Sequence, residues 1–360
     1  MINATWGRLP KVRTATLSLV CAWVAVATSA CGRQPQTSTM TPTVAPTVTP
    51  TPAATTAEAK PAIVITARAE PGGVVARIEL PTPLSELNFT LRSARIRAES
   101  WTMQSQGLQL VDDRISATDG SVFSVVELRI NPDQREHDRT YPCLVNAGTG
   151  SMIFNTGCLL VEDGTQPVQL EALTSGFVVS SWAGPSRLLA VPPNVDGKLG
   201  HYVLFTDSPA MSGGIWVGRS FPSWLAAELR HTSSDATAEW TQQFAVAPRR
   251  APTVFAAHLD VDADGDMYRG ETLSAGEVFL RFRGRAWSED NRATAAQAVR
   301  FLVHELVHLW NAERFKHPPG EHLAWLHEGS AEYLAIEFLT RRGTLSVDQR
   351  RGLLEQAIND

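Results

Sequence analysis

The sequence predicts an α+β protein, in which an N-terminal antiparallel β-domain precedes a lobe of mixed strands and helices. Between residues 63 and 205, short runs rich in Val, Ile and aromatic residues alternate with Gly, Pro, Asn and Asp, which is typical of strands. Beyond residue 221, apolar residues recur at helical spacing in several segments. We therefore expect a β-rich domain over 63–205 and a second lobe over 206–360.

The composition limits the class of function. The chain has 360 residues, of which 43% are hydrophobic, so it can bury a substantial core. Its formal net charge is −5, and it contains no long run of like charge. These features argue against a nucleic-acid partner.

Residues 1–30 are predicted to be a signal peptide, because basic residues precede an apolar run that is too short to span a membrane comfortably. The sequence "TSAC" followed by Gly32 resembles a bacterial lipoprotein cleavage site. We expect Cys31 to carry a lipid that anchors the exported protein in the bacterial cell envelope. The alternative is ordinary cleavage nearby, which releases a soluble secreted or periplasmic protein.

Residues 31–62 consist mostly of Thr, Pro and Ala and show no hydrophobic periodicity. Such a segment cannot bury a core, so we expect an extended, disordered spacer. The folded part should begin near Ile63.

Two cysteines remain for the folded part, Cys143 and Cys158. They lie in two apolar-rich runs separated by a Gly-containing turn. In an oxidising compartment we expect a disulfide across this hairpin. The alternative is a pair of free, buried cysteines.

The second lobe shows helical segments on either side of two strands. "PSWLAAELRH" and "SDATAEWTQQF" are predicted as two helices, and "PTVFAAHLDV" and "GEVFLRFRG" as strands. A helix with an apolar stripe is predicted from about residue 289, followed by helices near 322–341 and 346–358. The last begins with Ser346 and Gln349 in capping-box spacing.

Residues 303–310, "VHELVHLW", carry two histidines four residues apart. On a helix these positions share one face, so His304 and His308 can bind a single ion. Two histidines and a glutamate form a known catalytic zinc shell with an open position for water. Glu305 is rotated by about 100° from His304, which suits it better for accepting a proton from water than for binding metal. The pattern alone also fits a buried helix with two structural histidines.

A third ligand is available downstream, in "WLHEGSAEYLA". Trp325, Glu328, Gly329 and Tyr333 match a Trp-x-x-Glu-Gly-x-x-x-Tyr pattern. With the histidine pair, this pattern resembles the gluzincin metallopeptidases, especially the aminopeptidase N-like and glycyl aminopeptidase families. The resemblance is strong over about 300–338 and weaker over 250–300.

The resemblance implies a thermolysin-like α+β catalytic lobe with one zinc ion. It assigns His304, His308 and Glu328 as zinc ligands and Glu305 as the general base. It also places Glu332 where these enzymes often hold a ligand histidine through its other N–H, which fixes the tautomer. The alternative for Glu332 is a solvated helix carboxylate.

Some family features differ in this chain. The family's Gly-x-Met-Glu-Asn loop holds the substrate amine, but Tyr268 and Arg269 replace its Glu-Asn pair, which leaves Asp266 or Glu271 as candidate anchors. "GEVFLRF" is expected to be the edge strand along which substrate lies. We expect the chain to lack the C-terminal helical domain that supplies an oxyanion stabiliser in this family, so Tyr268 and Tyr333 are the candidates for that role.

The segment "DVDADGDMYRGE" also fits a twelve-residue calcium loop, with aspartates at positions 1, 3 and 5, Gly at 6 and Glu at 12. The acidic residues of this candidate loop are Asp260, Asp262, Asp264, Asp266 and Glu271. We expect a Ca²⁺ loop inserted in the lobe. The alternative is an acidic surface turn, because Asp-Gly repeats are common in turns.

The leading hypothesis is a lipid-anchored, zinc-dependent peptidase that acts on peptides or proteins, with the choice between aminopeptidase and endopeptidase open. A second hypothesis is a zinc-containing peptide-binding lipoprotein with weak or no catalysis. A third is a calcium-stabilised surface module with structural histidines. The sequence indicates neither the preferred substrate side chain nor the oligomeric state.

Overall fold

The computed structural model describes most of the chain from residue 62 to 359. The gaps are 91–93, 134, 136–141, 149, 163–167, 193–199, 249, 265–266, 274–275, 290–291 and 315–323. The predicted signal peptide, Cys31 and the predicted spacer up to residue 61 lie outside the described residues. Residues Lys60–Leu354 form one compact unit, and the fold described below is that of this unit. No helix in the described part of the chain is long and apolar enough to cross a membrane.

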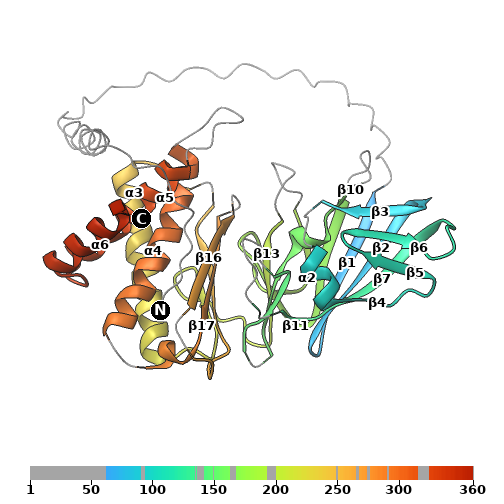
Figure 1. Cartoon of the computed structure of the whole chain (residues 1–360), viewed down its shortest axis with the longest axis horizontal. Coiled ribbons are helices and arrows are strands. Elements are labelled where there is room, and N and C mark those ends of the chain that lie inside the picture. Colours follow the sequence, from blue (N-terminus) through green and yellow to red (C-terminus); the bar gives the residue numbers. More distant parts are fainter. Residues whose placement is uncertain are drawn as a thin grey trace, which may run out of the picture. The chain divides into compact units, whose positions relative to one another are not determined.

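The first half of the unit is built on a nine-stranded sheet in the order β4-β7-β2-β1-β11-β13-β9-β8, with β12 paired to β11 (Figure 1). Its strands are β1 (Ile63–Glu70), β2 (Gly73–Leu84), β4 (Trp101–Met103), β7 (Phe123–Ile130), β8 (Leu144–Asn146), β9 (Met152–Asn155), β11 (Val168–Val179), β12 (Ser186–Val191) and β13 (Tyr202–Thr206). All pairs are antiparallel except β1–β11, which is parallel. The predicted antiparallel β-domain therefore contains one parallel pair. The alternation of apolar residues that predicts a strand is the same for either direction.

A four-stranded sheet packs with this half in the order β10-β3-β6-β5. Its strands are β3 (Glu86–Phe89), β5 (Leu108–Val111), β6 (Arg114–Ala117) and β10 (Val161–Glu162), and helix α2 (Ala94–Ser100) follows β3. The fully buried Arg97 of α2 pairs with Asp113 and lies over the rings of Phe89 and Trp101, at 4.3 and 4.8 Å from their centroids. Its charge is thus neutralised and its guanidinium is stacked, as a buried arginine requires.

The predicted disulfide is present. Cys143 precedes β8, Cys158 lies in the 3₁₀ helix η1 (Thr156–Leu159) after β9, and their sulfur atoms are bonded. Because β8 and β9 form an antiparallel hairpin, the two cysteines are brought together at its open end. The alternative of two free cysteines is wrong.

The second half contains a four-stranded sheet, β14-β15-β17-β16. The strands are β14 (Ile215–Val217), β15 (Thr253–Leu259), β16 (Met267–Leu273) and β17 (Glu277–Arg283). Strands β14, β15 and β17 are mutually parallel, and β16 is antiparallel to β17. The expected edge strand "GEVFLRF" is β17, which is internal because it pairs on both sides. The strand at this edge of the described sheet is β16, the neighbour of β17. The prediction that "GEVFLRF" forms the edge is therefore wrong.

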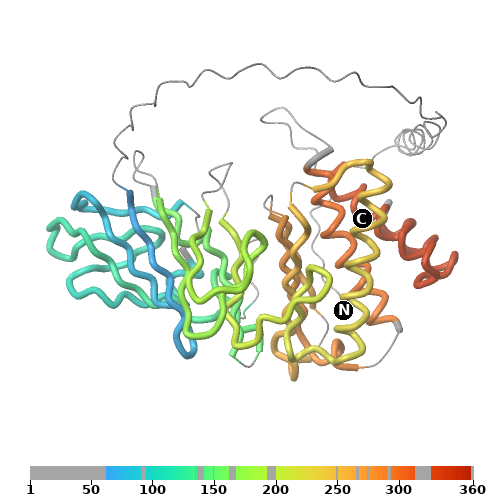
Figure 2. The backbone as a smooth tube through the Cα atoms, turned by 180° about the vertical axis from the view of Figure 1, so that it is seen from behind, coloured from blue at the N-terminus to red at the C-terminus, as the bar shows by residue number. Residues whose placement is uncertain are grey.

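Helices cover one face of this sheet, and the other face packs against the nine-stranded sheet. The helices that contact its strands are α3 (Ser223–Phe244) and α4 (Arg292–Arg314), and α5 (Ala324–Arg341) packs on α4. A short 3₁₀ helix η2 (Arg285–Ser288) precedes α4, and helix α6 (Val347–Asn359) follows α5 and continues beyond Leu354, where this unit ends. Figures 1 and 2, drawn from opposite sides, show α3, α4 and α5 on the same side of β16 and β17. On the opposite face, a buried apolar cluster joins Tyr202 and Leu204 of β13 to Phe255 and Phe279.

The predicted apolar stripe of α4 is buried. Its residues Val299, Leu302, Val303, Leu306 and Trp310 are fully inaccessible to solvent. This side of α4 faces the core, so the remaining sides carry the polar groups described below.

One helix prediction is corrected by the structure and another is confirmed. The two helices expected between residues 223 and 244 are a single helix, α3, of 22 residues. Its central polar stretch contains no Gly or Pro to end it, and buried Leu229, Ala236 and Trp240 keep the helical spacing. The capping box of α6 is confirmed, with Ser346 and Gln349 exchanging hydrogen bonds of 2.9 and 3.2 Å.

Candidate metal centre and active site

Three side chains from two helices converge at one point. His304 and His308 lie one turn apart on α4, and Glu328 lies in the first turns of α5. The Nε2 atoms of the two histidines are 3.2 Å apart, and Glu328 Oε2 is 3.2 Å from His304 Nε2 and 3.6 Å from His308 Nε2. Within the described residues, this is the one group of three or more acidic, histidine or cysteine side chains close enough to share an ion.

The spacing of these atoms fits a tetrahedral zinc shell. Ligand atoms about 2.0–2.2 Å from zinc at tetrahedral angles lie roughly 3.3–3.6 Å from one another. The observed separations of 3.2, 3.2 and 3.6 Å are close to that edge length. Two imidazole nitrogens and one carboxylate oxygen are also a donor set that zinc prefers. The side chains present therefore fit zinc.

A second carboxylate orients His304. Glu332, one turn after Glu328 on α5, lies 3.1 Å from Nδ1 of His304, and Arg300 donates to its other oxygen at 2.7 Å. This arrangement places a ring hydrogen on Nδ1, so that in the neutral ring Nε2, on the side of Glu328 and His308, is the nitrogen that can bind a metal ion. Arg300 was not identified from the sequence, although it lies four residues before His304 and therefore on the same side of α4.

These contacts change the proton affinity of the metal-free site. Burial lowers the pKa of His304, but hydrogen bonds to Glu328 and Glu332 outweigh it and raise the pKa from 6.5 to about 9. Hydrogen bonds from His304 and His308 hold the pKa of Glu328 well below its ordinary value. Without a metal, His304 therefore carries a proton at neutral pH, and a metal ion must displace it.

The start of α5 is fixed to α4 by Asn311. This fully buried side chain donates to the carbonyl oxygen of His327 at 3.3 Å and to Ser330 Oγ at 3.0 Å. Both acceptors flank Glu328, so Asn311 holds the backbone that carries the third ligand. His327 contributes its backbone here, while His317 and His322 lie outside the described residues.

Glu305 follows the first histidine and faces strand β16. Its side chain is 7% exposed, and Thr272 Oγ1 lies 2.9 Å from its Oε2 and 2.9 Å from its backbone carbonyl oxygen. Burial raises the pKa of Glu305, and this effect outweighs the charges of His304 and His308, which lower it. A buried carboxylate beside the ligand histidines, with a raised pKa, has the properties of a general base.

The acidic residues of the predicted calcium loop are not gathered in the described structure. Asp260 pairs with Arg283 at 2.7 Å and Asp264 with Arg285 at 2.9 Å. Glu271 belongs to β16 and hydrogen-bonds to Tyr202 of β13. Asp266 lies outside the described residues. The strand that begins at Met267 carries the twelfth loop residue away from the first, so the calcium prediction has no support in the structure.

The residues considered for the amine anchor and the oxyanion also have defined positions. Glu271 lies next to Gly270 on β16 and, through its bond to Tyr202, faces the nine-stranded sheet. Tyr268 packs its ring against Phe301, with centroids 4.6 Å apart. Tyr333 interacts with Arg350 of α6. These contacts connect Tyr268 to the helix that carries the histidines and Tyr333 to α6. The side chain of Trp325 lies outside the described residues.

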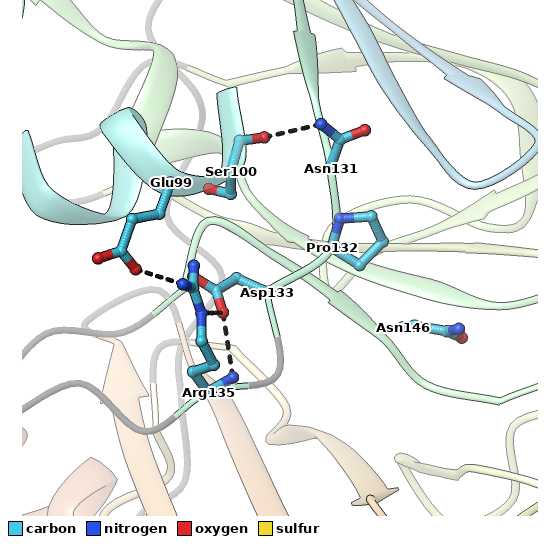
Figure 3. Close-up of a pocket in the computed structure, with 7 residues that line it drawn as sticks. All are labelled: Glu99, Ser100, Asn131, Pro132, Asp133, Arg135 and Asn146. Carbon is cyan, nitrogen blue, oxygen red and sulfur yellow. Dashed lines mark hydrogen bonds and ion pairs between the residues drawn. The ribbon is translucent and has the colours of Figure 1, made fainter. Parts of the chain in front are cut away.

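A pocket in the first half of the molecule lies apart from these residues. It has a volume of about 400 Å³ and is lined by polar groups around the end of β7 (Figure 3). Arg135 crosses it, forming a two-pronged pair with Asp133, both contacts at 2.9 Å, and a further pair with Glu99. The one guanidinium and two carboxylates of the described lining are thus paired with one another.

Comparison with known proteins bears on the fold. No protein-family model matches the sequence, and no curated protein matches it significantly. Among solved structures, the chain is similar to an aminopeptidase N family protein from Idiomarina loihiensis, with a TM-score of 0.52 and 14% identity over 79% of this chain. A two-domain M1 zinc metallopeptidase bound to L-arginine aligns over 78% of this chain and 70% of its own at a TM-score of 0.33 and 15% identity, too low to carry an argument.

The chain spans 55% of the length of the Idiomarina loihiensis structure. At 14% identity this likeness concerns the fold and leaves the chemistry to the side chains described above. The chain therefore has an α+β, metallopeptidase-like fold that resembles the aminopeptidase N family.

Proposed function

We propose that the protein is a zinc-dependent peptidase of the gluzincin type. The observation that carries the proposal is the convergence of His304, His308 and Glu328 at tetrahedral spacing, with the buried Glu305 beside them on the same helix. A carboxylate next to a metal shell, but outside it, is the arrangement that hydrolysis by an activated water requires.

The site residues divide the work between binding and proton transfer. Zinc held by the three ligands would polarise the scissile carbonyl and lower the pKa of the attacking water. Glu305 accepts the proton of that water and returns it to the leaving amine. Glu332 and Arg300 keep His304 in the tautomer that presents Nε2 to the metal.

Strand β16 supplies a binding edge for peptide substrates. In the described sheet it pairs with β17 alone, so we place a bound peptide along its other side. A peptide that adds to this edge gains main-chain hydrogen bonds with little dependence on its side chains. Thr272 of the same strand contacts Glu305, so a peptide bound there lies close to the general base.

The choice between aminopeptidase and endopeptidase depends on whether a substrate amine has an anchor. Glu271 is the candidate within the described residues, but its side chain lies on the face of β16 opposite to Glu305, toward Tyr202. Its bond to Tyr202 would have to be shared with an incoming ammonium. Cleavage of peptides with free but not acetylated amino termini would support an aminopeptidase, and equal cleavage of both would support an endopeptidase.

The central experiment compares wild type with Glu305→Gln. Both purified proteins are expected to contain one zinc per chain by inductively coupled plasma mass spectrometry, because the substitution leaves the ligands in place. Cleavage of a peptide library should fall by about 10²–10⁴-fold in the variant, the usual contribution of a general base. Zinc without any difference in cleavage would favour the zinc-containing peptide-binding protein. Absence of zinc would contradict both.

We also propose that the mature protein is lipid-anchored at Cys31 in a bacterial cell envelope. The proposal rests on the signal-like segment and on "TSAC" before Gly32. Expression in a bacterial host with a labelled fatty acid should label the wild type and leave Cys31→Ser unlabelled. Equal labelling of the two would exclude this anchor.

A further inference from the structure

Strand β16 contacts the general-base candidate at two alternate positions. Thr272 Oγ1 lies 2.9 Å from Oε2 of Glu305 and 2.9 Å from its backbone carbonyl oxygen. Thr272 itself is held in the sheet opposite Val278 of β17. The hydroxyl is therefore a fixed point against which the otherwise rotatable Glu305 carboxylate is oriented.

Gly270, two residues earlier on the same face of β16, provides the space that the carboxylate occupies. A Cβ atom at this position would lie 2.4 Å from Oε1 and 2.5 Å from Cδ of Glu305, and 2.6 Å from Cζ of Phe301. The backbone of Gly270 is not in the left-handed region, so the absence of a side chain serves packing rather than conformation. Glu305 lies directly against the strand.

The two contacts act on different oxygens. The Thr272 hydroxyl meets Oε2, and the Cα of Gly270 leaves room for Oε1. Because side chains at positions 270 and 272 point to the same face of a strand, one rigid element limits both the rotation and the displacement of the carboxylate. A bond to the backbone carbonyl alone would leave the side chain free to rotate.

We propose that Thr272 and Gly270 are positioning residues that orient Glu305 toward the attacking water. The inference rests on the proposed function and extends it to residues outside the metal shell. The strand that offers its edge to a peptide also sets the direction of the base. Disturbing Thr272 should therefore lower kcat while leaving substrate affinity and zinc content unchanged.

The test uses Thr272→Val, which keeps the shape and removes the hydroxyl, and Thr272→Ser, which restores it. On the peptide that wild type cleaves best, we expect Thr272→Val to lower kcat by roughly 10- to 100-fold, the scale of a misplaced catalytic group. KM should stay within about threefold of wild type, a change too small to indicate lost binding, and zinc content should stay at one ion per chain. Thr272→Ser should recover most of kcat. Thr241→Val, which removes a hydroxyl bond to the carbonyl of Thr237 in α3, is the matched control.

A second variant tests the space at Gly270. Gly270→Ala should displace Glu305 and lower kcat with zinc retained, and Gly352→Ala, which meets nothing within 4 Å, is its control. The proposal is overturned if Thr272→Val keeps the wild-type kcat, or if Thr272→Ser is as impaired as Thr272→Val, because either result would show that the hydroxyl does not orient the base.

Crystal structures separate failure of this inference from failure of the proposed function. If wild type and Glu305→Gln cleave peptides equally, the peptidase proposal fails, and the orientation of Glu305 is then read from electron density. A single carboxylate rotamer in wild type that becomes displaced or multiple in Thr272→Val supports the positioning role. The same single rotamer in both proteins overturns it.

Discussion

A buried carboxylate joins the two halves of the molecule, and its removal should be strongly destabilising. Glu277, at the start of β17, is fully buried and accepts three hydrogen bonds from the nine-stranded sheet and its adjoining loop. Ser181 Oγ lies at 2.6 Å, the backbone nitrogen of Tyr202 at 2.7 Å and His201 Nδ1 at 3.1 Å. The ring of Trp182 covers His201, with centroids 4.6 Å apart. All three donors lose their acceptor together when Glu277 is replaced.

The expected magnitude follows from these contacts. A hydrogen bond to a charged group contributes about 1.5–3 kcal/mol, and a buried donor left without a partner is destabilising by about 1–3 kcal/mol. Because the three bonds share one carboxylate, their effects do not add fully. We expect Glu277→Ala to lower the free energy of unfolding by about 3–5 kcal/mol, as for other broken buried charged networks. Glu277→Gln should lower it less, because the amide oxygen can still accept while the NH₂ group opposes a donor.

Urea unfolding followed by circular dichroism measures this change. Glu79→Gln is the control, since Glu79 forms an exposed pair with Arg77 and its loss should alter stability by less than about 0.5 kcal/mol. Zinc content should be unchanged, because none of the cluster residues contacts a metal ligand in the described structure. A loss below about 1 kcal/mol for Glu277→Ala, with an unchanged urea slope, would refute the reasoning.

Three further outcomes follow from the site and the disulfide. Zinc must displace the proton of His304, whose pKa is about 9, so the apparent zinc affinity should rise by up to about tenfold per pH unit from pH 7 to 9. A zinc affinity that does not change with pH in a chelator-competition titration would contradict this. Glu332→Ala should weaken zinc binding by roughly 10- to 100-fold in the same assay, whereas an unchanged affinity would deny its role in orienting the ring. Replacing Cys143 and Cys158 by Ser should lower stability by about 3 kcal/mol for a loop of 15 residues, with zinc content preserved; an unaltered urea midpoint would contradict it.

The parts of the site that depend on local geometry could be predicted from the sequence. Positions four apart on a helix share a face, so the pairing of His304 with His308 requires only that α4 be a helix. Glu332 follows Glu328 by the same spacing on α5, which explains its place beside His304. The disulfide likewise depends on a hairpin whose turn is visible in the sequence.

The parts that depend on tertiary pairing could not be predicted. Glu277 is 76 residues from His201 and 96 from Ser181, and no local pattern connects them. A strand pattern also shows that a segment is extended but not which strands flank it, so β17 was expected at the edge that β16 occupies. The calcium-loop prediction finds no support among the described residues for a similar reason, because the pattern records oxygen-bearing residues but not the strand in which the last of them lies.

Strand β16 connects the site to the rest of the fold, because its side chains point alternately toward helix α4 and toward strand β13. Gly270 and Thr272 face α4 and hold Glu305, whereas Glu271 faces β13 and bonds to Tyr202. An edge strand paired on one side would ordinarily be among the more mobile parts of a sheet. Here contacts on both faces hold the strand in place. Under the proposed function, a peptide added along this strand would leave Glu305 in place, which is the preorganisation that general-base catalysis requires.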